Sequence, residues 1–371
     1  MEIKIDRSEL LKSVSRVQSI LERRSNMPIL STVLLNAKEG TVNVSATDLE
    51  LGFRQTIAAE IIDPGNIAIS GRKLFEILKE SNSQEFHIKE KENNWVHLTD
   101  KVARFDLACL PADEYPTFME PENVTMVEVP GAVLSEMINK TIYSVTVEDA
   151  GFKLSGVFTE KVEKGGATYI RMVSTDGHRL SMIDKSLPGI DALDLGSGVM
   201  IPKKGMNELN KFTAEEASVN LGFKEKHCVA RKENALLVIR LLEAKFPDYQ
   251  AVVPKEVTYH IDINRIQLLD AMRKMLILSD DRYRAVKVGI ESDVMELIST
   301  NPDLGEAEEK VSIDFKGEKI EVGFNPRYFV DALQSMESES VSLGFIDNAR
   351  PCIIEGEADK GFKGLIMPMR V

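Results

Sequence analysis

Residues 175–180 read Thr-Asp-Gly-His-Arg-Leu and place four polar side chains around a single glycine. The Asp-Gly pair is a turn signal between two strand-like segments, residues 173–174 and 179–183, so we predict a hairpin corner here. Related corners stand at Thr47-Asp48, 128 residues earlier, and at Thr300-Asn301, 125 residues later. Three corners at nearly equal spacing predict that the chain is built from three copies of one plan.

Three interpretations of the middle corner stay open on the residues alone. Asp176 could orient His178 for acid/base chemistry, because histidine titrates near neutral pH. The corner could equally be a turn whose aspartate bonds its own backbone and whose other side chains are exposed. It could also be the lip of a binding site, with Gly177 admitting a partner's backbone and Leu180 supplying an apolar floor.

Length and composition bound the class of protein. A chain of 371 residues is longer than a single domain with one hydrophobic core usually is, so we predict two or three domains. The threefold repeat favours three. With 43% hydrophobic and 28% charged residues, it is predicted to be an ordinary globular protein. The net charge of −13 repels nucleic acid on average, so contact with DNA or RNA requires a locally basic surface.

The sequence carries no targeting, metal or catalytic motif. Its N-terminus lacks the apolar run of a signal peptide, and no segment is apolar enough to span a membrane, so we expect a cytoplasmic protein. Cys109, Cys228 and Cys352 are widely spaced in expected strands and predict buried, reduced thiols. Zinc-ligand spacings, phosphate loops and nucleophile elbows are missing, which predicts no metal, no cofactor and no catalytic residue.

The expected helices carry basic residues. In the first helix, residues 8–21, an apolar face recurs at the helical period and opposes a basic stripe. A second basic group opens the helix that starts near residue 71, and a third opens the helix near residue 203. Such a stripe is usually a solvated helix face, but it contrasts with the acidity of this chain. The basic residues on and directly after these helices are Lys12, Arg16, Arg23, Arg24, Arg72, Lys73, Lys203, Lys204 and Lys211, of which Arg24 continues the positive charge into the following loop.

The three copies predict an α+β fold of three similar two-helix/β-sheet domains at residues 1–122, 126–251 and 256–371. Long alternating strands at the domain boundaries have edges that need partners, so neighbouring domains are expected to pair edge to edge. Three such domains form an arc that is half of a ring. Two arcs joined head to tail would close the ring without an open edge.

Six motifs, in order along the whole chain, resemble the family of bacterial DNA polymerase III beta subunits, the replicative sliding clamps. They are residues 27–30 (Met-Pro-Ile-Leu), 47–50 (Thr-Asp-Leu-Glu), 175–180, 246–249 (Phe-Pro-Asp-Tyr), 323–325 (Gly-Phe-Asn) and 367–370 (Met-Pro-Met-Arg). The resemblance implies a head-to-tail homodimeric ring around double-stranded DNA, without catalytic activity of its own. It also implies partners: a clamp-loader complex, and the replicative polymerase and other DNA polymerases or repair proteins that bind through short peptides.

The resemblance implies two further groups of site residues, and the basic helices add a third. The partner-peptide pocket, between the second and third domains, is implied at Leu154, Thr175, Gly177, His178, Arg179, Leu180, Pro247, Val252, Asn325, Tyr328, Pro351, Met367, Pro368 and Met369. The dimer interface is implied at Lys73, Phe105 and Leu107, meeting Ile277 and Leu278 beside the acidic Glu306, Glu308 and Glu309. DNA contacts are expected at Arg24, Arg72, Lys203 and Lys204, with Lys12 and Arg16 supported by the basic stripe alone.

One loop departs from the family pattern, and two other classes of function stay open. Residues 151–153 read Gly-Phe-Lys where the best-known members carry a basic residue and tyrosines, so the DNA contacts of that loop are not assigned. An enzyme of nucleic-acid metabolism would use Asp176 and His178 as an acid/base pair, beside a metal or a nucleophile. A DNA-free scaffold of the same shape would lack the basic lining.

Overall fold

The computed structural model describes residues 1–22, 26–118, 120–146, 155–213, 217–232, 234–279 and 284–370. The chain divides into two compact units, each of which is described by itself. Unit 1 holds Met1–Val129, Ala192–Asp194 and Lys211–Leu241, and unit 2 holds Pro130–Asp191, Leu195–Asn210 and Leu242–Val371.

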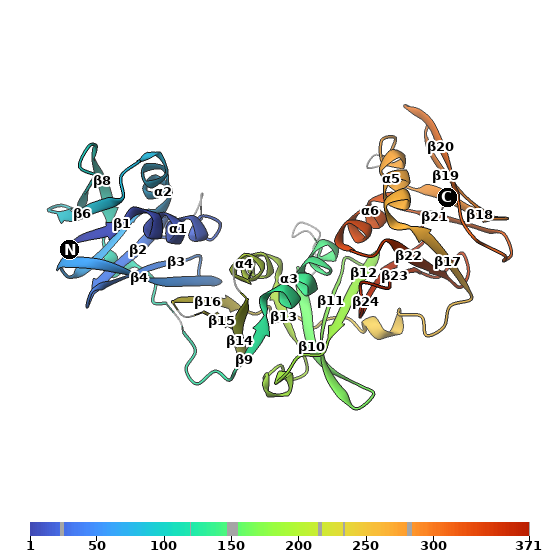
Figure 1. Ribbon diagram of the computed structural model, residues 1–371, viewed down its shortest axis with the longest axis horizontal. Coiled ribbons are helices and arrows are strands. Elements are labelled where there is room, and N and C mark those ends of the chain that lie inside the picture. Colours follow the sequence, from blue (N-terminus) through green and yellow to red (C-terminus); the bar gives the residue numbers. More distant parts are fainter. Residues whose placement is uncertain are drawn as a thin grey trace. The chain divides into compact units, whose positions relative to one another are not determined.

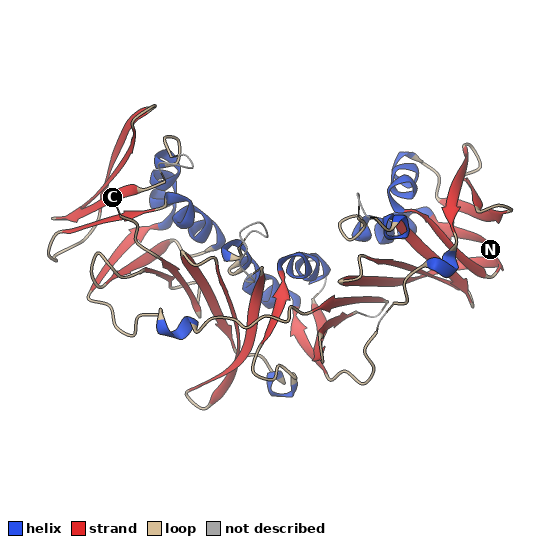
Figure 2. Cartoon of the chain, turned by 180° about the vertical axis from the view of Figure 1, so that it is seen from behind, coloured by secondary structure: helices blue, strands red, loops and turns tan. Residues whose placement is uncertain are grey.

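The helices follow the predicted plan of two per copy. Within the described residues they are α1 (Arg7–Val17), α2 (Gly71–Glu80), α3 (Gly131–Asn139), α4 (Lys203–Thr213), α5 (Arg265–Met275) and α6 (Pro326–Ser335). Polar side chains cap several N-termini: Asp6 accepts from the backbone N–H of Glu9, and Asn325 accepts from that of Arg327. Contacts pair α1 with α2 in unit 1 and α5 with α6 in unit 2, and Figures 1 and 2 show each pair side by side.

The first helix is shorter than predicted, because α1 ends at Val17 and not near residue 21. The backbone N–H groups of Gln18 and Ile20 bond to carbonyls three residues back, so tight turns replace the last helical turn. The side-chain amide of Gln18 donates to the carbonyl of Gly71 at the start of α2, which holds the turn in place. The apolar face is confirmed, since Leu10, Val14 and Val17 are all buried.

Unit 1 is built on a twelve-stranded sheet in the order β1-β6-β7-β8-β5-β2-β3-β4-β16-β15-β14-β9, and β1 also pairs with β4. Its strands are β1 (Glu2–Asp6), β2 (Thr32–Lys38), β3 (Thr41–Thr47), β4 (Leu51–Asp63), β5 (Gly65–Ser70), β6 (Glu85–Lys91), β7 (Trp95–Thr99), β8 (Arg104–Leu110), β9 (Met126–Pro130), β14 (Ser218–Lys224), β15 (His227–Arg231) and β16 (Ala235–Arg240). Strand β4 is thirteen residues long because two strands share it in tandem: β16 pairs with its first residues and β1 with its last.

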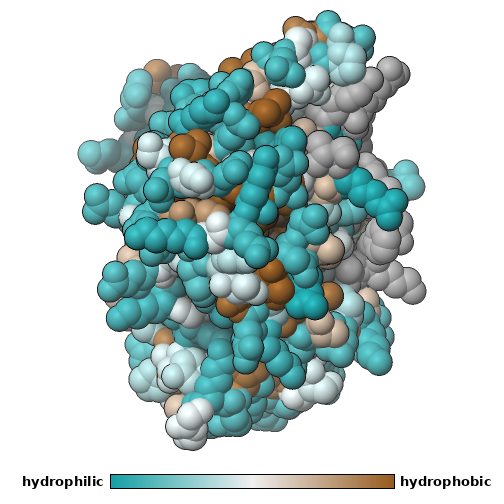
Figure 3. All heavy atoms as spheres, turned by 90° about the vertical axis from the view of Figure 1, so that its right-hand side faces the viewer, coloured by the Kyte–Doolittle hydropathy of each residue, from teal (hydrophilic) through white to brown (hydrophobic). Residues whose placement is uncertain are grey.

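Unit 2 contains an eight-stranded sheet, β13-β10-β11-β12-β24-β23-β22-β17, and a four-stranded sheet, β20-β19-β18-β21. The larger sheet comprises β10 (Gly156–Lys164), β11 (Ala167–Thr175), β12 (Arg179–Lys185), β13 (Val199–Pro202), β17 (Tyr259–Asn264), β22 (Ser340–Phe345), β23 (Cys352–Gly356) and β24 (Phe362–Ile366). The smaller comprises β18 (Val286–Glu291), β19 (Val294–Asn301), β20 (Gly305–Ser312) and β21 (Ile320–Phe324). The face of unit 2 seen in Figure 3 is mainly hydrophilic, in keeping with ion pairs such as Lys287–Glu321 on the smaller sheet.

The expected edge-to-edge pairing of neighbouring copies is confirmed. Strand β16 of the second copy pairs antiparallel with β4 of the first, and β24 of the third copy pairs with β12 of the second. The alternation of apolar residues predicts strands at residues 308–315 and 364–369, and both predictions are misplaced. The first strand is β20, which starts three residues earlier at Gly305, and the last strand, β24, ends at Ile366. After Ile366 the chain keeps only an isolated bridge between Met369 and Gly323. The same pattern predicts a strand over residues 152–159, of which residues 152–154 lie outside the described residues.

The thiols follow the prediction with one correction. Cys228 and Cys352 are buried in β15 and β23, but Cys109 in β8 is only half-buried. Burial raises the pKa of all three thiols, that of Cys109 to about 12, so they stay protonated near neutral pH. In the part of the chain that the structure describes, no helix is long and apolar enough to cross a membrane.

Gly361 is predicted to be essential where the third copy meets the second. It adopts φ +88°, and a Cβ there would lie 2.2 Å from the carbonyl oxygen of Asp184 at the end of β12. Gly361→Ala should therefore lower the free energy of unfolding by about 3 kcal/mol or more, measured by urea denaturation.

Gly165 supplies the matched control, because it also has a positive φ, +58°, but open space around its Cβ position. Gly165→Ala should cost only about 1 kcal/mol, the strain of the left-handed backbone alone. Equal losses for the two variants would contradict the proposed steric contact.

Candidate functional site

The middle corner is held by its own side chains. The Thr175 hydroxyl donates to the carbonyl oxygen of Arg179 over 2.6 Å, and Asp176 Oδ1 accepts the backbone N–H groups of His178 and Arg179. Together these bonds fix the turn between β11 and β12, as the sequence predicted for an aspartate in a turn. The corner therefore presents a defined backbone rather than a mobile loop tip.

The corner of the first copy repeats this geometry. The Thr47 hydroxyl donates to the carbonyl of Leu51 over 2.7 Å, and Asp48 Oδ1 accepts the N–H groups of Glu50 and Leu51. In the third copy Asn301 Oδ1 accepts the N–H of Asp303, which keeps part of the arrangement. The threefold repeat read from the sequence is thus a repeat of hydrogen bonds.

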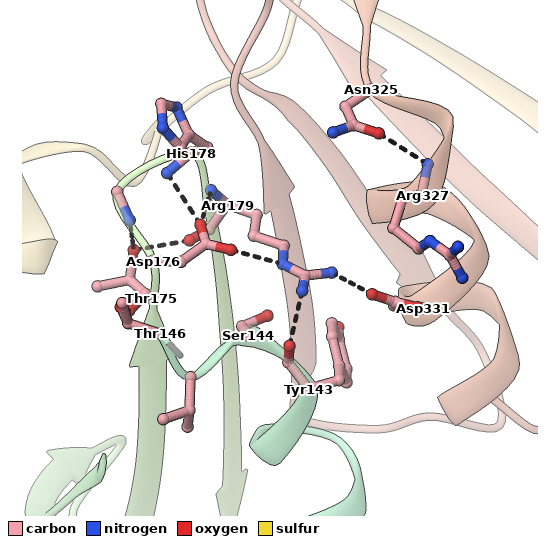
Figure 4. A network of polar contacts seen from close by, with 12 residues as sticks. Tyr143, Ser144, Thr146, Thr175, Asp176, His178, Arg179, Asn325, Arg327 and Asp331 are labelled. Atoms are coloured by element: carbon pink, nitrogen blue, oxygen red, sulfur yellow. Dashed lines mark hydrogen bonds and ion pairs between the residues drawn. The ribbon is translucent and has the colours of Figure 1, made fainter. Parts of the chain in front are cut away.

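Arg179 is the centre of the site, and Figure 4 shows its guanidinium between two structural copies. It donates to Asp176 Oδ2 (3.0 Å), to Asp331 Oδ2 on α6 (2.6 Å) and to the carbonyl of Tyr143 (2.7 Å). It also lies over the rings of Tyr328, at 4.6 Å from the centroid, and Tyr143, at 5.4 Å. With 11% of its side chain exposed, Arg179 ties the corner to α6.

The electrostatics of this cluster favour a fixed charge. Burial opposes the charged guanidinium, but the hydrogen bond to Asp331 and the charge of Asp176 outweigh it and raise the pKa of Arg179. Burial raises the pKa of the Tyr143 hydroxyl, which accepts a 2.5 Å hydrogen bond from Ser181. Arg179 therefore stays charged near neutral pH.

The geometry gives no support to Asp176 and His178 as an acid/base pair. Asp176 bonds to the backbone of His178, and in Figure 4 the imidazole points away from the carboxylate. The remaining oxygen of Asp176 is taken by Arg179. No group of three or more His, Cys, Asp or Glu side chains able to hold a metal ion occurs in the described residues.

The C-terminal tail lies against this corner. The N–H of Met367 donates to the carbonyl of His178 over 2.9 Å, and the N–H of Met369 donates to that of Gly323 over 2.8 Å. Met367 lines a groove of about 700 Å³ together with Pro351 and the segment that connects the second and third copies. The groove is lined by Ala251, Val252, Val253, Pro254, Lys255, Glu256, Val257, Thr258, Ile346, Arg350, Pro351 and Met367.

The wall of this groove is anchored by a buried polar cluster. Tyr249 packs beside Phe246 just before the groove, and its hydroxyl accepts from Arg171 over 3.0 Å. Arg171 in turn pairs with Asp184 over 2.6 Å. Burial opposes ionisation of Asp184, but the hydrogen bonds from Arg171 and Lys164 prevail and lower its pKa. The connecting segment is therefore fixed to β11 and β12.

The structure brings most of the predicted pocket residues into one neighbourhood, in different roles. Val252, Pro351 and Met367 line the groove, whereas Gly177 and His178 are exposed at the corner above the tail. Leu180 is only 4% exposed and packs in the core with Val173 and Leu365, so it supports the sheet and does not form an exposed floor. Asn325 caps α6, Tyr328 packs against Arg179, and Pro247, Pro368 and Met369 keep partial or full exposure. Leu154 lies outside the described residues.

Sequence reasoning missed several residues of this region. Asp331 and Tyr143 complete the Arg179 cluster, yet they lie 152 and 36 residues away from it, and no local pattern signals the pairing. Lys255, Ile346 and Arg350 line the groove. A signal for Arg350 was present, because it directly precedes the predicted Pro351 in a loop between two strands.

Three of the predicted DNA-contact residues, Arg72, Lys203 and Lys204, lie at helix starts. Arg72 is 74% exposed and pairs with Glu76 over 2.8 Å, and Lys204 is exposed at the start of α4. Lys203 is half-buried, and its ammonium group is 3.4 Å from the carbonyl of Val145. On α1, Lys12 is exposed but Arg16 is half-buried and donates to Gln55 over 3.3 Å. Arg24 lies outside the described residues.

The predicted interface residues lie next to strand edges. Phe105 and Leu107 are half-buried on β8, whose residues 104–108 pair only with β7 in the described part of the chain. Ile277 is 75% exposed after α5, and Leu278 is half-buried. Strand β20, which carries the acidic residues Glu306, Glu308 and Glu309, pairs only with β19 among the described strands.

Comparison with known proteins assigns the three copies to one family. Residues 1–119, 128–248 and 250–370 match the N-terminal, central and C-terminal domains of the DNA polymerase III beta subunit. The chain is 30% identical to the beta sliding clamp of Caulobacter vibrioides, and the match covers 100% of each protein. Among solved structures it is similar to Caulobacter crescentus pol III beta, with TM-score 0.94, 29% identity and 100% coverage of both chains. A sliding clamp from Bartonella birtlesii bound to griselimycin matches at TM-score 0.94 and 30% identity, again over 100% of both chains.

Asp331 is predicted to be the main electrostatic support of the Arg179 cluster. Asp331→Ala leaves a buried guanidinium with one carboxylate fewer, and partial exposure of Asp331 (23%) moderates the effect. The free energy of unfolding should fall by about 2 kcal/mol, measured by chemical denaturation. Glu321, an exposed carboxylate that pairs with Lys287 and Lys319, supplies the control: Glu321→Ala should cost less than about 0.5 kcal/mol. An Asp331 variant as stable as the Glu321 variant would refute this role.

Proposed function

The chain belongs to the family of DNA polymerase III beta subunits, the sliding clamps of DNA replication, and on that premise we propose that two copies close head to tail around duplex DNA. Each chain contributes three domains, at residues 1–122, 126–251 and 256–371. The ring tethers DNA enzymes and catalyses no reaction itself. Retention on DNA comes from closure, because a closed ring cannot leave sideways whatever its affinity for the duplex.

The observation that carries this proposal is a pair of open strand edges. Residues 104–108 of β8 and all of β20 lack a second strand partner within the described residues. Exposed edges of this kind invite pairing with another chain. Half-buried Phe105 and Leu107 beside one edge, and exposed Ile277 beside the other, supply apolar contacts. Pairing of β8 in each chain with β20 of the partner chain would cover the open edges of both chains and close the ring.

Charge supports the same pairing. Strand β20 carries Glu306, Glu308 and Glu309, whereas Arg104, 65% exposed, lies on the open edge of β8, and the predicted interface residue Lys73, 61% exposed, lies near the start of α2. Opposite charges at the rim of an apolar contact favour one orientation over the alternatives. Head-to-tail association therefore matches unlike edges, while head-to-head association would face acid with acid.

We further propose that basic helix residues contact DNA weakly and without sequence preference. With a net charge of −13 per copy, the ring as a whole repels DNA, so attraction depends on Arg24, Arg72, Lys203, Lys204, Lys12 and Arg16. Contacts to phosphates carry no sequence information, and weak contacts permit sliding. A clamp-loader complex is the expected agent of ring opening.

Partner proteins are proposed to bind at the groove beside the C-terminal tail. Val252, Pro351 and Met367 give it an apolar, adaptable lining that suits a short peptide with apolar anchors. The corner of Gly177 and His178 stands directly above Met367, joined by the hydrogen bond to the His178 carbonyl. Replicative and other DNA polymerases and repair proteins are the proposed sources of such peptides.

Retention on DNA should depend on the topology of the DNA. We expect the protein, loaded on nicked circular DNA by its loader complex, to co-elute with the circle and to be released when the circle is linearised. Replacing Ile277 and Leu278 by Ala removes apolar contacts at the proposed interface and should give monomers by light scattering. That double variant should not be retained on circles.

The matched control for the interface is Ile266→Ala, which removes an exposed apolar side chain from α5, in a residue 48% exposed and outside the proposed contact. It should leave both the dimer and its retention on circles intact. A dimeric Ile277/Leu278 variant, or wild-type protein that stays on linear DNA with free ends, would refute the proposed ring.

Peptide capture should depend on Met367. Met367→Ala removes a side chain from the groove, and the lost apolar area predicts roughly tenfold weaker binding of a polymerase-derived peptide by calorimetry. Deletion of residues 367–371 should abolish binding while the dimer persists, because the proposed dimer contacts involve other residues. His178→Ala should weaken binding only modestly. Undiminished binding by the deletion variant would exclude this groove as the site.

A further inference from the structure

A second groove, in unit 1, lies at the corner of the first copy. It has a volume of about 810 Å³ and lies between residues 47–52, residues 116–118 and the paired ends of β15 and β16. The apolar part of its lining is Leu49, Leu51, Pro116, Phe118 and Val238, and the charged part is Glu50, Glu225, Lys226 and Arg240, with His227 between them.

The register of the strands shows that this groove repeats the one beside the C-terminal tail. Leu51 pairs with Ile239 in the first junction, and Arg179 pairs with Ile366 in the second. One residue further, the N–H of Arg240 donates to the carbonyl of Glu50 over 2.8 Å, as the N–H of Met367 does to that of His178. Arg240 therefore occupies the place of Met367.

The same register places Leu49 at the position of Gly177. Leu49 adopts φ +76°, a left-handed conformation that is rare for leucine, and its side chain is 52% exposed at the groove. Gly177 has the same sign of φ, +87°, without strain. A strained, exposed leucine at the lip of a hollow is a feature that folding alone does not require.

The linker of the first copy forms the opposite wall. Phe118 packs with Val238 and Leu236 of β16, and a Cβ at Gly52 would lie 2.7 Å from its ring. The guanidinium of Arg54 lies over the ring, 5.2 Å from its centroid, and pairs with Glu120. The wall is thus fixed, and the groove between Phe118 and Leu49 is part of the folded structure.

We propose that this groove binds a short extended peptide segment of a partner protein, with an apolar anchor followed by a carboxylate. Leu49, Phe118 and Val238 contact the anchor, as Val252, Pro351 and Met367 do in the first groove. The carboxylate pairs with Arg240, whose guanidinium is exposed and forms no ion pair within the described residues. The exchange of Met367 for Arg240 gives the two grooves different peptide preferences.

Charges around the groove restrict the peptide further. Glu50 and Glu225 would repel a peptide that is acidic throughout, so the carboxylate is single and lies at the Arg240 end. Burial and the nearby charge of Arg240 lower the pKa of His227, which leaves a neutral imidazole to accept or donate a hydrogen bond. The proposed site is distinct from the first groove in its residues and in its charge.

The test uses a fluorescein-labelled peptide, Gly-Ser-Leu-Phe-Asp-Ser-Gly, and fluorescence anisotropy with the full chain carrying Met367→Asp. That change should prevent binding at the groove beside the C-terminal tail (the first groove). Any binding that is measured then reports on the second groove alone. We expect saturable binding with a dissociation constant below about 1 mM. Leu49→Gly should weaken it at least fivefold, and this substitution keeps the backbone conformation because glycine adopts the same φ.

Arg240→Gln supplies the test of charge recognition. The substitution should weaken binding of the Asp peptide at least fivefold. It should leave the binding of a matched peptide with Asn in place of Asp unchanged, whereas a merely structural role of Arg240 would weaken the binding of both peptides. Val102→Ala, at an apolar residue that is 93% exposed, is the control and should bind as the parent does. Absence of saturable binding, or equal binding by the Leu49, Arg240 and Val102 variants, would overturn the proposal. Neither outcome would bear on the proposal that partner peptides bind at the first groove.

Discussion

The structure depends on the pairing of antiparallel strand edges between copies. Strands β4 and β12 each leave a hairpin corner with one edge open, and the last strand of the following copy, β16 or β24, covers it. An edge left open inside such an assembly would carry unpaired N–H and C=O groups, which favour uncontrolled association. Each such junction covers two strand edges. Several edges stay open within the described residues, that of β17 among them, and the proposed ring would join those of β8 and β20.

The two junctions between copies, β4 with β16 (the first joint) and β12 with β24 (the second joint), have the same backbone pairing but different side chains. At the paired register position the first joint has Leu51, which is 1% exposed, and the second has Arg179. A buried leucine needs only apolar neighbours, whereas a buried guanidinium needs partners for its donors, and Asp176, Asp331 and the Tyr143 carbonyl supply them. The second joint therefore draws α6 and the start of the second copy into one cluster, and this cluster underlies the corner against which the tail binds.

The sequence predicted those parts of the fold that local patterns encode. Alternating apolar residues located most strands, and apolar residues recurring at the helical period located the helices, as in residues 8–21. Helix ends and the final strand were less accurate, because the side chain of Gln18 and the bridge of Met369 depend on contacts with distant residues. The Arg179 cluster could not be predicted for the same reason: no pattern of spacing links Tyr143 to Asp331.

The charges of the helices explain how an acidic ring could hold DNA loosely. Arg72 pairs with Glu76 one turn away, and both side chains are largely exposed. An exposed pair of this kind contributes at most about 1 kcal/mol, so a phosphate can replace the carboxylate at little cost. Lys203, whose ammonium group lies 3.4 Å from the Val145 carbonyl, would likewise exchange a neutral partner for a phosphate in the proposed contact. Each contact is weak and reversible, so the proposed ring can move along DNA while its closure alone prevents escape.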